Sequence, residues 1–187
     1  MNVWRIAGNS NYKSCILIDN NDKQIYDPAF YFKEKQEDLS FKRKIKFIDI
    51  DCLFADISNY FGTNGTFVIN DKTKKIFETH FNYIQFFPLI CDQYPEKTFW
   101  LLNVYNYQDV LDISHCKYNT ILNRKGNRVI NHIDSYAFKN EVCNLDIFKI
   151  ILNGKKYTID LFVTDKFKNI IEQNNITGLN LKKVYEL

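Results

Sequence analysis

Hydrophobic and polar residues alternate along several short stretches of this chain, which is the pattern of strands that bury one face. In residues 41–50, Phe41, Ile45 and Phe47 share one parity while three lysines share the other. Apolar or alternating runs bounded by turn residues predict further strands at residues 4–7, 15–18, 67–69, 83–90, 99–105, 128–133, 145–152 and 157–163. Because proline has no N–H to donate to a ladder, Pro88 predicts that its strand lies at a sheet edge or breaks there.

Two segments combine a strand with an amphipathic helix that starts at a polar residue. The strand at 67–69 leads through Asn70, a suitable N-cap, into a helix over residues 71–81. The strand ending at residue 163 leads through Thr164, whose hydroxyl suits the same position, into a helix that begins at Asp165. Phe-Val, Asp-Lys-x-Lys and Ile-x-Glu recur at similar offsets in both segments. The recurrence is compatible with a duplication. It is equally compatible with two unrelated strand–helix units whose cap and helix chemistry favours the same residue types.

The balance of elements predicts an α+β fold. A third, short helix is predicted over residues 51–60, where Leu53, Phe54 and Ile57 share a side. Short turns join most strands, and Asn153-Gly154 is the strongest hairpin signal in the chain. We therefore expect a single domain over residues 1–187, built on a mostly antiparallel β-sheet with two or three helices.

Composition and charge argue against several classes of protein. Hydrophobic residues make up 45% of the 187 residues, which suits an ordered globular chain rather than a disordered one. A net charge of +3 is too mild for a dedicated nucleic-acid binder, and no apolar run is long enough to span a membrane. Five scattered cysteines without a CxxC pair argue against structural zinc and favour free thiols in a reducing cytoplasm. We expect a cytoplasmic protein with no cofactor and no nucleic-acid or membrane partner.

One short segment carries candidate catalytic residues. Asp109, Asp112 and His115 lie close together in the sequence, and two carboxylates with an imidazole are ligands that a divalent metal accepts. A metal-dependent hydrolase that uses this cluster is therefore an alternative function. A nucleic-acid module that uses the lysine-rich stretch 41–48 is a further one, ranked last. The chain has no nucleophile elbow and no glycine-rich phosphate loop, so neither nucleophilic catalysis nor phosphate binding is indicated by a motif.

Six motifs in a fixed order connect the chain with a known family. They are Ile84-Gln85-Phe86-Phe87-Pro88-Leu89, Phe99-Trp100-Leu101-Leu102-Asn103-Val104, Asp109-Val110-Leu111-Asp112 with Ser114, Asp146-Ile147-Phe148-Lys149, Phe162-Val163-Thr164-Asp165-Lys166-Phe167-Lys168 and Thr177-Gly178-Leu179. Together they resemble the bacterial immunity proteins of polymorphic-toxin systems, in the group known as immunity family eleven. The resemblance covers about residues 67–187, whereas residues 1–66 match only in general character. Thr164 replaces the usual Ser, and Lys149 replaces a common Arg.

The resemblance implies a non-catalytic antidote that binds a cognate bacterial toxin domain and blocks it by occlusion. Many such toxins are nucleases with basic clefts, for which an inhibitor often presents acidic groups. Two local acidic clusters are therefore the expected partner-binding residues: Asp49, Asp51 and Asp56 in one, and Asp109 and Asp112 in the other. The sequence specifies neither the toxin nor the oligomeric state.

Overall fold

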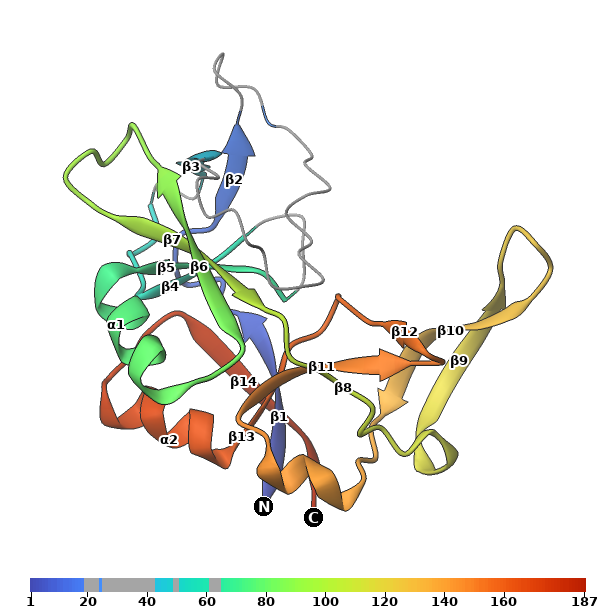
Figure 1. The fold of residues 1–187 in the computed structure, drawn as a ribbon. Helices are drawn as coiled ribbons and strands as arrows, with labels where there is room; N and C mark the ends of the chain where they lie inside the picture. The colour runs from blue at the N-terminus through green and yellow to red at the C-terminus, as the bar shows by residue number, and fades with distance from the viewer. Residues whose placement is uncertain (19–23, 25–42, 49–50, 61–64) are drawn as a thin grey trace.

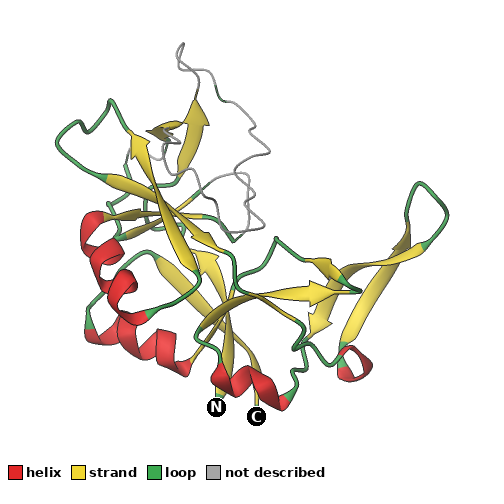
Figure 2. Cartoon of the chain, in the orientation of Figure 1, coloured by secondary structure: helices red, strands yellow, loops and turns green. Residues whose placement is uncertain are grey.

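The computed structural model describes residues 1–18, 24, 43–48, 51–60 and 65–187 (Figure 1). Both ends of the strand predicted at 41–50, including Asp49, lie outside these residues. Within them the chain is α+β, with two α-helices and predominantly β-structure (Figure 2). Strand pairing is mostly antiparallel, with two parallel pairs, so the expected fold class is confirmed while the sheets are mixed. Neither described helix is long and apolar enough to cross a membrane.

Two larger sheets form the body of the molecule. The first has, in spatial order, β2 (Cys15–Ile18), β3 (Arg43–Phe47), β6 (Ile84–Ile90), β7 (Phe99–Val104), β5 (Phe67–Asn70) and β4 (Ile57–Asn59). The second has β12 (Lys155–Lys156), β11 (Ile147–Leu152), β13 (Phe162–Thr164), β1 (Asn2–Gly8) and β14 (Leu179–Glu186), and β8 (Tyr107–Gln108) also pairs with β11. A separate hairpin of β9 (Lys117–Leu122) and β10 (Arg128–Ser135) projects from this body (Figure 1).

The same supersecondary unit occurs once in each sheet. Helix α1 (Asp71–His80) connects β5 to β6, and β7 lies between these two strands, antiparallel to both. Helix α2 (Asp165–Gln173) connects β13 to β14, and β1 lies between them, again antiparallel to both. Each unit is therefore a split β-α-β, in which a third strand fills the gap between two parallel ones.

In the first unit, the start of the helix is fastened to an indole on the middle strand. Trp100 of β7 pairs with Ile69 of β5, and its Nε1 donates to Asp71 Oδ1 over 3.3 Å. Lys74, one turn further along α1, holds its Nζ 4.5 Å from the centre of the Trp100 ring. Asn70 caps the helix as predicted, because its side chain accepts a hydrogen bond from the Thr73 N–H over 2.9 Å.

The second unit repeats this arrangement at equivalent positions. Trp4 of β1 pairs with Val163 of β13, and its Nε1 donates to Asp165 Oδ1 over 2.9 Å. Lys168 holds its Nζ 4.4 Å from the centre of the Trp4 ring. Local strand–helix chemistry explains a shared cap, but it does not place an indole on a strand that is remote in the sequence. The recurrence therefore favours duplication of a whole split β-α-β unit.

Three apolar clusters lie in layers around the two sheets. The central cluster lies between the sheets and collects the inner faces of both, together with the buried faces of α1 and α2. The two outer clusters cover the opposite face of each sheet. Period-two alternation sorts the side chains: Phe67 and Ile69 face the central cluster, whereas Val68 between them faces an outer one. The helices lie side by side (Figure 1), where Phe167 packs against Phe77 and Phe81 at ring-centre distances of 5.5 and 5.1 Å.

The helix predicted over residues 51–60 is absent, and β4 occupies part of that stretch instead. Distant backbone partners explain the difference. The N–H of Asp56 donates to Thr177 Oγ1 over 3.1 Å, and the N–H of Ile57 donates to the Thr177 carbonyl over 3.1 Å. Gly178 permits this close approach, since it has φ +104° and a Cβ there would lie 1.9 Å from the Ile57 oxygen.

Two other local predictions are also wrong. Pro88 lies within β6, an interior strand that continues through it, and the described ladder to β3 starts at the next residue, Leu89. Thr164 precedes α2, but its hydroxyl donates to the Leu145 carbonyl over 2.8 Å instead of capping the helix. The hairpin at Asn153-Gly154 is confirmed, because both residues have the positive φ angles that a tight type I′ turn requires.

A buried lysine lies in β11. Lys149 has its Nζ 5.8 Å from the centre of the Tyr107 ring, and no ion pair joins it to a carboxylate within the described ranges. Burial lowers the pKa of Lys149 to about 8 and raises the pKa of Tyr107 to about 12. At neutral pH the folded chain therefore holds a charge in an environment that disfavours it.

We predict that Gly178→Ala lowers the free energy of unfolding by roughly 3 kcal/mol or more, because it adds an overlap with the Ile57 carbonyl to an unfavourable positive φ. Gly126→Ala is the matched control, since Gly126 has φ +77° but nothing within 4 Å of an added Cβ. It should lose only about 1 kcal/mol. Urea denaturation of both variants measures the difference, and equal losses would show that the Thr177–Gly178 contact is not tight.

We predict that Lys149→Met raises the free energy of unfolding at pH 7 by on the order of 2 kcal/mol. Because the pKa of Lys149 is lower in the folded state, the unfolded chain binds more protons between about pH 8 and the ordinary lysine value. Wild-type stability therefore gains from this group as the pH rises through that window, and the advantage of the variant shrinks. Denaturation of both proteins at pH 7 and pH 9.5 measures the change, and a constant difference would contradict it.

Candidate partner-binding site

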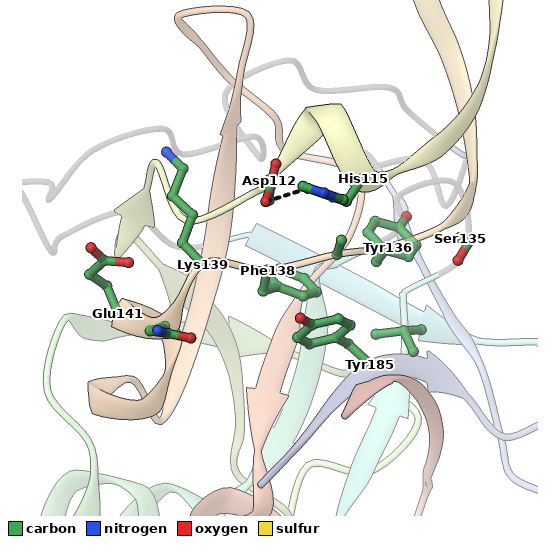
Figure 3. A pocket seen from close by; sticks show the side chains of 11 residues that line it. Asp112, His115, Ser135, Tyr136, Phe138, Lys139, Glu141 and Tyr185 are labelled. Carbon is green, nitrogen blue, oxygen red and sulfur yellow. Dashed lines mark hydrogen bonds and ion pairs between the residues drawn. The ribbon is translucent and has the colours of Figure 1, made fainter. Parts of the chain in front are cut away.

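An open pocket of about 890 Å³ lies where the short 3-10 helix η2 (Ile113–His115), the chain after β10 and the end of β14 meet. Figure 3 labels eight of its lining side chains, which are Asp112, His115, Ser135, Tyr136, Phe138, Lys139, Glu141 and Tyr185. Charged groups of both signs surround an aromatic floor. The pocket also lies at the base of the β9–β10 hairpin, because η2 directly precedes β9 and Ser135 ends β10.

Backbone hydrogen bonds hold the two sides of this pocket together. The Asp112 N–H donates to the Ala137 carbonyl over 2.9 Å, and the Lys139 N–H donates to the Val110 carbonyl over 2.8 Å. Leu111 lies between them and forms a bridge to Phe138. Both apolar side chains are buried in the outer cluster of the second sheet, so the polar groups beside them are fixed to a packed base.

Asp112 and His115 line the pocket and point toward one another (Figure 3), and Ser114 joins them in a compact polar group. Ser114 Oγ donates to Asp112 Oδ1 over 2.6 Å, and His115 Nδ1 lies 2.8 Å from Asp112 Oδ2 and 3.1 Å from Ser114 Oγ. These bonds from Ser114 and His115 lower the pKa of Asp112. A nucleophile relay would place the serine and the aspartate on opposite ring nitrogens, whereas here both contact Nδ1. The arrangement therefore suits a structural cap better than a catalytic triad.

The aromatic floor is joined to a buried carboxylate. Tyr136 is buried, and its hydroxyl donates to Asp160 Oδ2 over 3.0 Å. Arg5 also reaches this carboxylate, with Nη1 3.6 Å from Asp160 Oδ1. Burial, with the charge of Asp160, raises the pKa of Tyr136, so the phenol stays protonated. The floor offers ring surfaces to a ligand while its hydroxyl is already bonded inside the protein.

The structure separates the candidate metal ligands that the sequence placed close together. Lys139 Nζ lies 3.3 Å from Asp109 Oδ1, whereas Asp112 bonds to His115. Among the described residues, no three or more His, Cys, Asp or Glu side chains are grouped so that they would hold a metal ion. Asp109, Asp112 and His115 therefore do not come together as the hydrolase alternative requires.

The acidic residues expected at a partner interface differ in accessibility. The Asp109 side chain is 71% exposed, and Asp51 is also exposed. Asp56 is only 16% exposed, and its carboxylate accepts from the Thr177 N–H and the Asn70 side chain. Burial would raise the pKa of Asp56, but these bonds and nearby Lys72 outweigh it and lower the pKa. Asp56 therefore acts as a structural tie, while its predicted role in partner binding stays a prediction.

Sequence reasoning missed half of the projecting hairpin. The sequence predicts the strand at 128–133, but not β9, its partner strand. The signal was present, since Lys117–Leu122 leads into the Asn-rich turn and contains Tyr118, Ile121 and Leu122. Polar residues between these three give no clean alternation, so the pattern alone did not mark a strand.

The comparisons with known proteins identify a family. None of the curated proteins matches the chain. The model of the immunity protein family Imm11 matches residues 8–186, which extends the resemblance across the N-terminal part as well. Because this match spans nearly the whole length, the chain belongs to the Imm11 immunity protein family.

Proposed function

We propose that this chain is a cytoplasmic immunity protein that binds a cognate toxin domain and neutralises it by occlusion, without catalysis of its own. The observation that carries the proposal is the match of residues 8–186 to the immunity family. Occlusion requires a surface that covers a toxin's active site, and specific interfaces of this kind bury roughly 1,200–2,000 Å² in total.

The polar groups of the pocket support binding rather than turnover. Asp112 is bonded to Ser114 and His115, and the Tyr136 hydroxyl is bonded to Asp160. Side chains held in this way keep their geometry when a partner docks, which reduces the entropy lost on association. Of the predicted acidic residues that the structure describes, Asp109 and Asp51 are exposed and so accessible to a toxin surface.

The experiment is co-expression with the toxin encoded beside this chain's gene. We predict that cells producing the active toxin stop growing and that this chain restores growth. Calorimetric titration of the purified chain with a catalytically inactivated form of that toxin should give one-to-one binding with a Kd of 1 μM or tighter, about −8 kcal/mol or more favourable.

A toxin from an unrelated system is the control and should be neither bound nor neutralised. The proposal is wrong if the adjacent toxin kills cells that contain the folded chain and the purified pair fails to associate.

A further inference from the structure

The β9–β10 hairpin, here called the arm (residues 117–135), extends away from the two packed sheets (Figure 1). Every residue of β9 is exposed along its whole length. Within the described ranges each strand pairs only with the other, so neither outer edge of the arm has a ladder partner there. An isolated two-stranded hairpin is marginally stable in water, so the chain maintains here an element that its own core does not cover.

The outer part of the arm exposes a large apolar side chain on each of its two faces. Ile121 pairs with Val129 on one face, and Leu122 pairs with Arg128 on the other. Ile121 is 50% exposed and Leu122 is 68% exposed. A sheet that only bordered the core would keep its apolar side chains on one face. Apolar groups on both faces fit an element that becomes surrounded when a partner binds.

The arm is held rigidly at its base and at its turn. Ile133 is buried in the outer apolar cluster of the second sheet, and Ile130 packs against that cluster. At the turn, Asn123 Oδ1 accepts from the Lys125 and Asn127 N–H groups over 2.9 and 3.0 Å. A partner therefore meets a formed hairpin, which lowers the ordering cost of binding.

Charge concentrates on the arm. The arm contains four basic residues (Lys117, Arg124, Lys125 and Arg128) and one acidic residue, Asp134. Its formal charge is therefore +3. The whole chain also has a net charge of +3, so the rest of the molecule is neutral overall. Asp134 lies near the base of the arm, where it accepts a hydrogen bond from Asn119 over 2.9 Å. The charged residues at the turn are therefore all basic.

We propose that the arm is the element that enters the toxin, and that it fits a cleft with apolar walls and a rim of carboxylates. This inference rests on the proposed function. A six-residue strand spans roughly 20 Å, long enough to reach into an active-site cleft. The Ile121–Val129 pair on one face and Leu122 on the other provide apolar contact area, while Arg124 and Lys125 at the turn attract the acidic rim. The pocket at its base would receive the edge of the same partner.

The test titrates the inactivated toxin from the adjacent gene with four variants of the full chain. We expect Leu122→Ser to weaken binding at least tenfold, and Arg124→Glu with Lys125→Glu to weaken it at least tenfold at 50 mM salt. Leu53→Ser is the matched apolar control, since Leu53 is 72% exposed on the body. Lys155→Glu with Lys182→Glu reverses the same number of charges outside the arm. Both controls should bind within twofold of wild type.

Each outcome decides one statement. Equal binding by arm variants and controls would refute the proposed role of the arm but leave the proposal of a toxin partner standing. Failure of the wild type to bind would refute both proposals. Wild-type affinity should fall from 50 to 300 mM salt, and the Arg124/Lys125 double variant should lose most of that dependence. Circular dichroism and thermal melting verify that the variants fold. A wild-type dimer in sedimentation that Leu122→Ser converts to monomer would assign the arm to self-association instead and overturn the proposal.

Discussion

Phe167 of α2 packs against Phe77 of α1 and against Phe81, the residue that follows α1, and this contact joins two units that come from distant parts of the chain. All three rings are buried in the central cluster, which also takes the inner faces of both sheets. Burial of each such ring contributes roughly 1.5–3 kcal/mol, and neither helix would be stable in water without it. Because the central cluster joins the two sheets, it sets how the second sheet, with the pocket and the arm fixed to its outer cluster, lies against the first.

The sequence predicted the elements whose signals are local. The Asn70 cap, the strand at 99–105 and the Asn153-Gly154 turn depend on neighbouring residues, and the structure has all three. The predictions from sequence were wrong where a residue far along the chain determines the local structure. Thr177 bonds to the backbone of Asp56 and Ile57 and so directs the chain into β4 instead of a helix, and the Leu145 carbonyl accepts the hydroxyl that Thr164 was expected to use as a cap.

Much of the candidate site was beyond sequence reasoning for the same reason. The cluster at Asp112 and His115 was recognised, but the Lys139 that bonds to Asp109 and the Tyr185 that completes the floor lie far along the chain. Pocket walls assembled from three segments leave no contiguous pattern. The strong charge of the arm was hidden as well, because the mild total of +3 averages over a neutral body.

The place of β1 in the second unit has a kinetic consequence. The strands and helix of the first unit follow one another along residues 67–104, so that unit can form as soon as it has been made. The second unit needs β1 as its middle strand, and Trp4 lies 161 positions before its partner Asp165. At roughly 5–20 residues per second the ribosome takes about 8–30 s to cover that distance. During this interval neither β13 nor β14, the two strands that β1 pairs with, is available, so the middle strand of the second unit is made first and paired last.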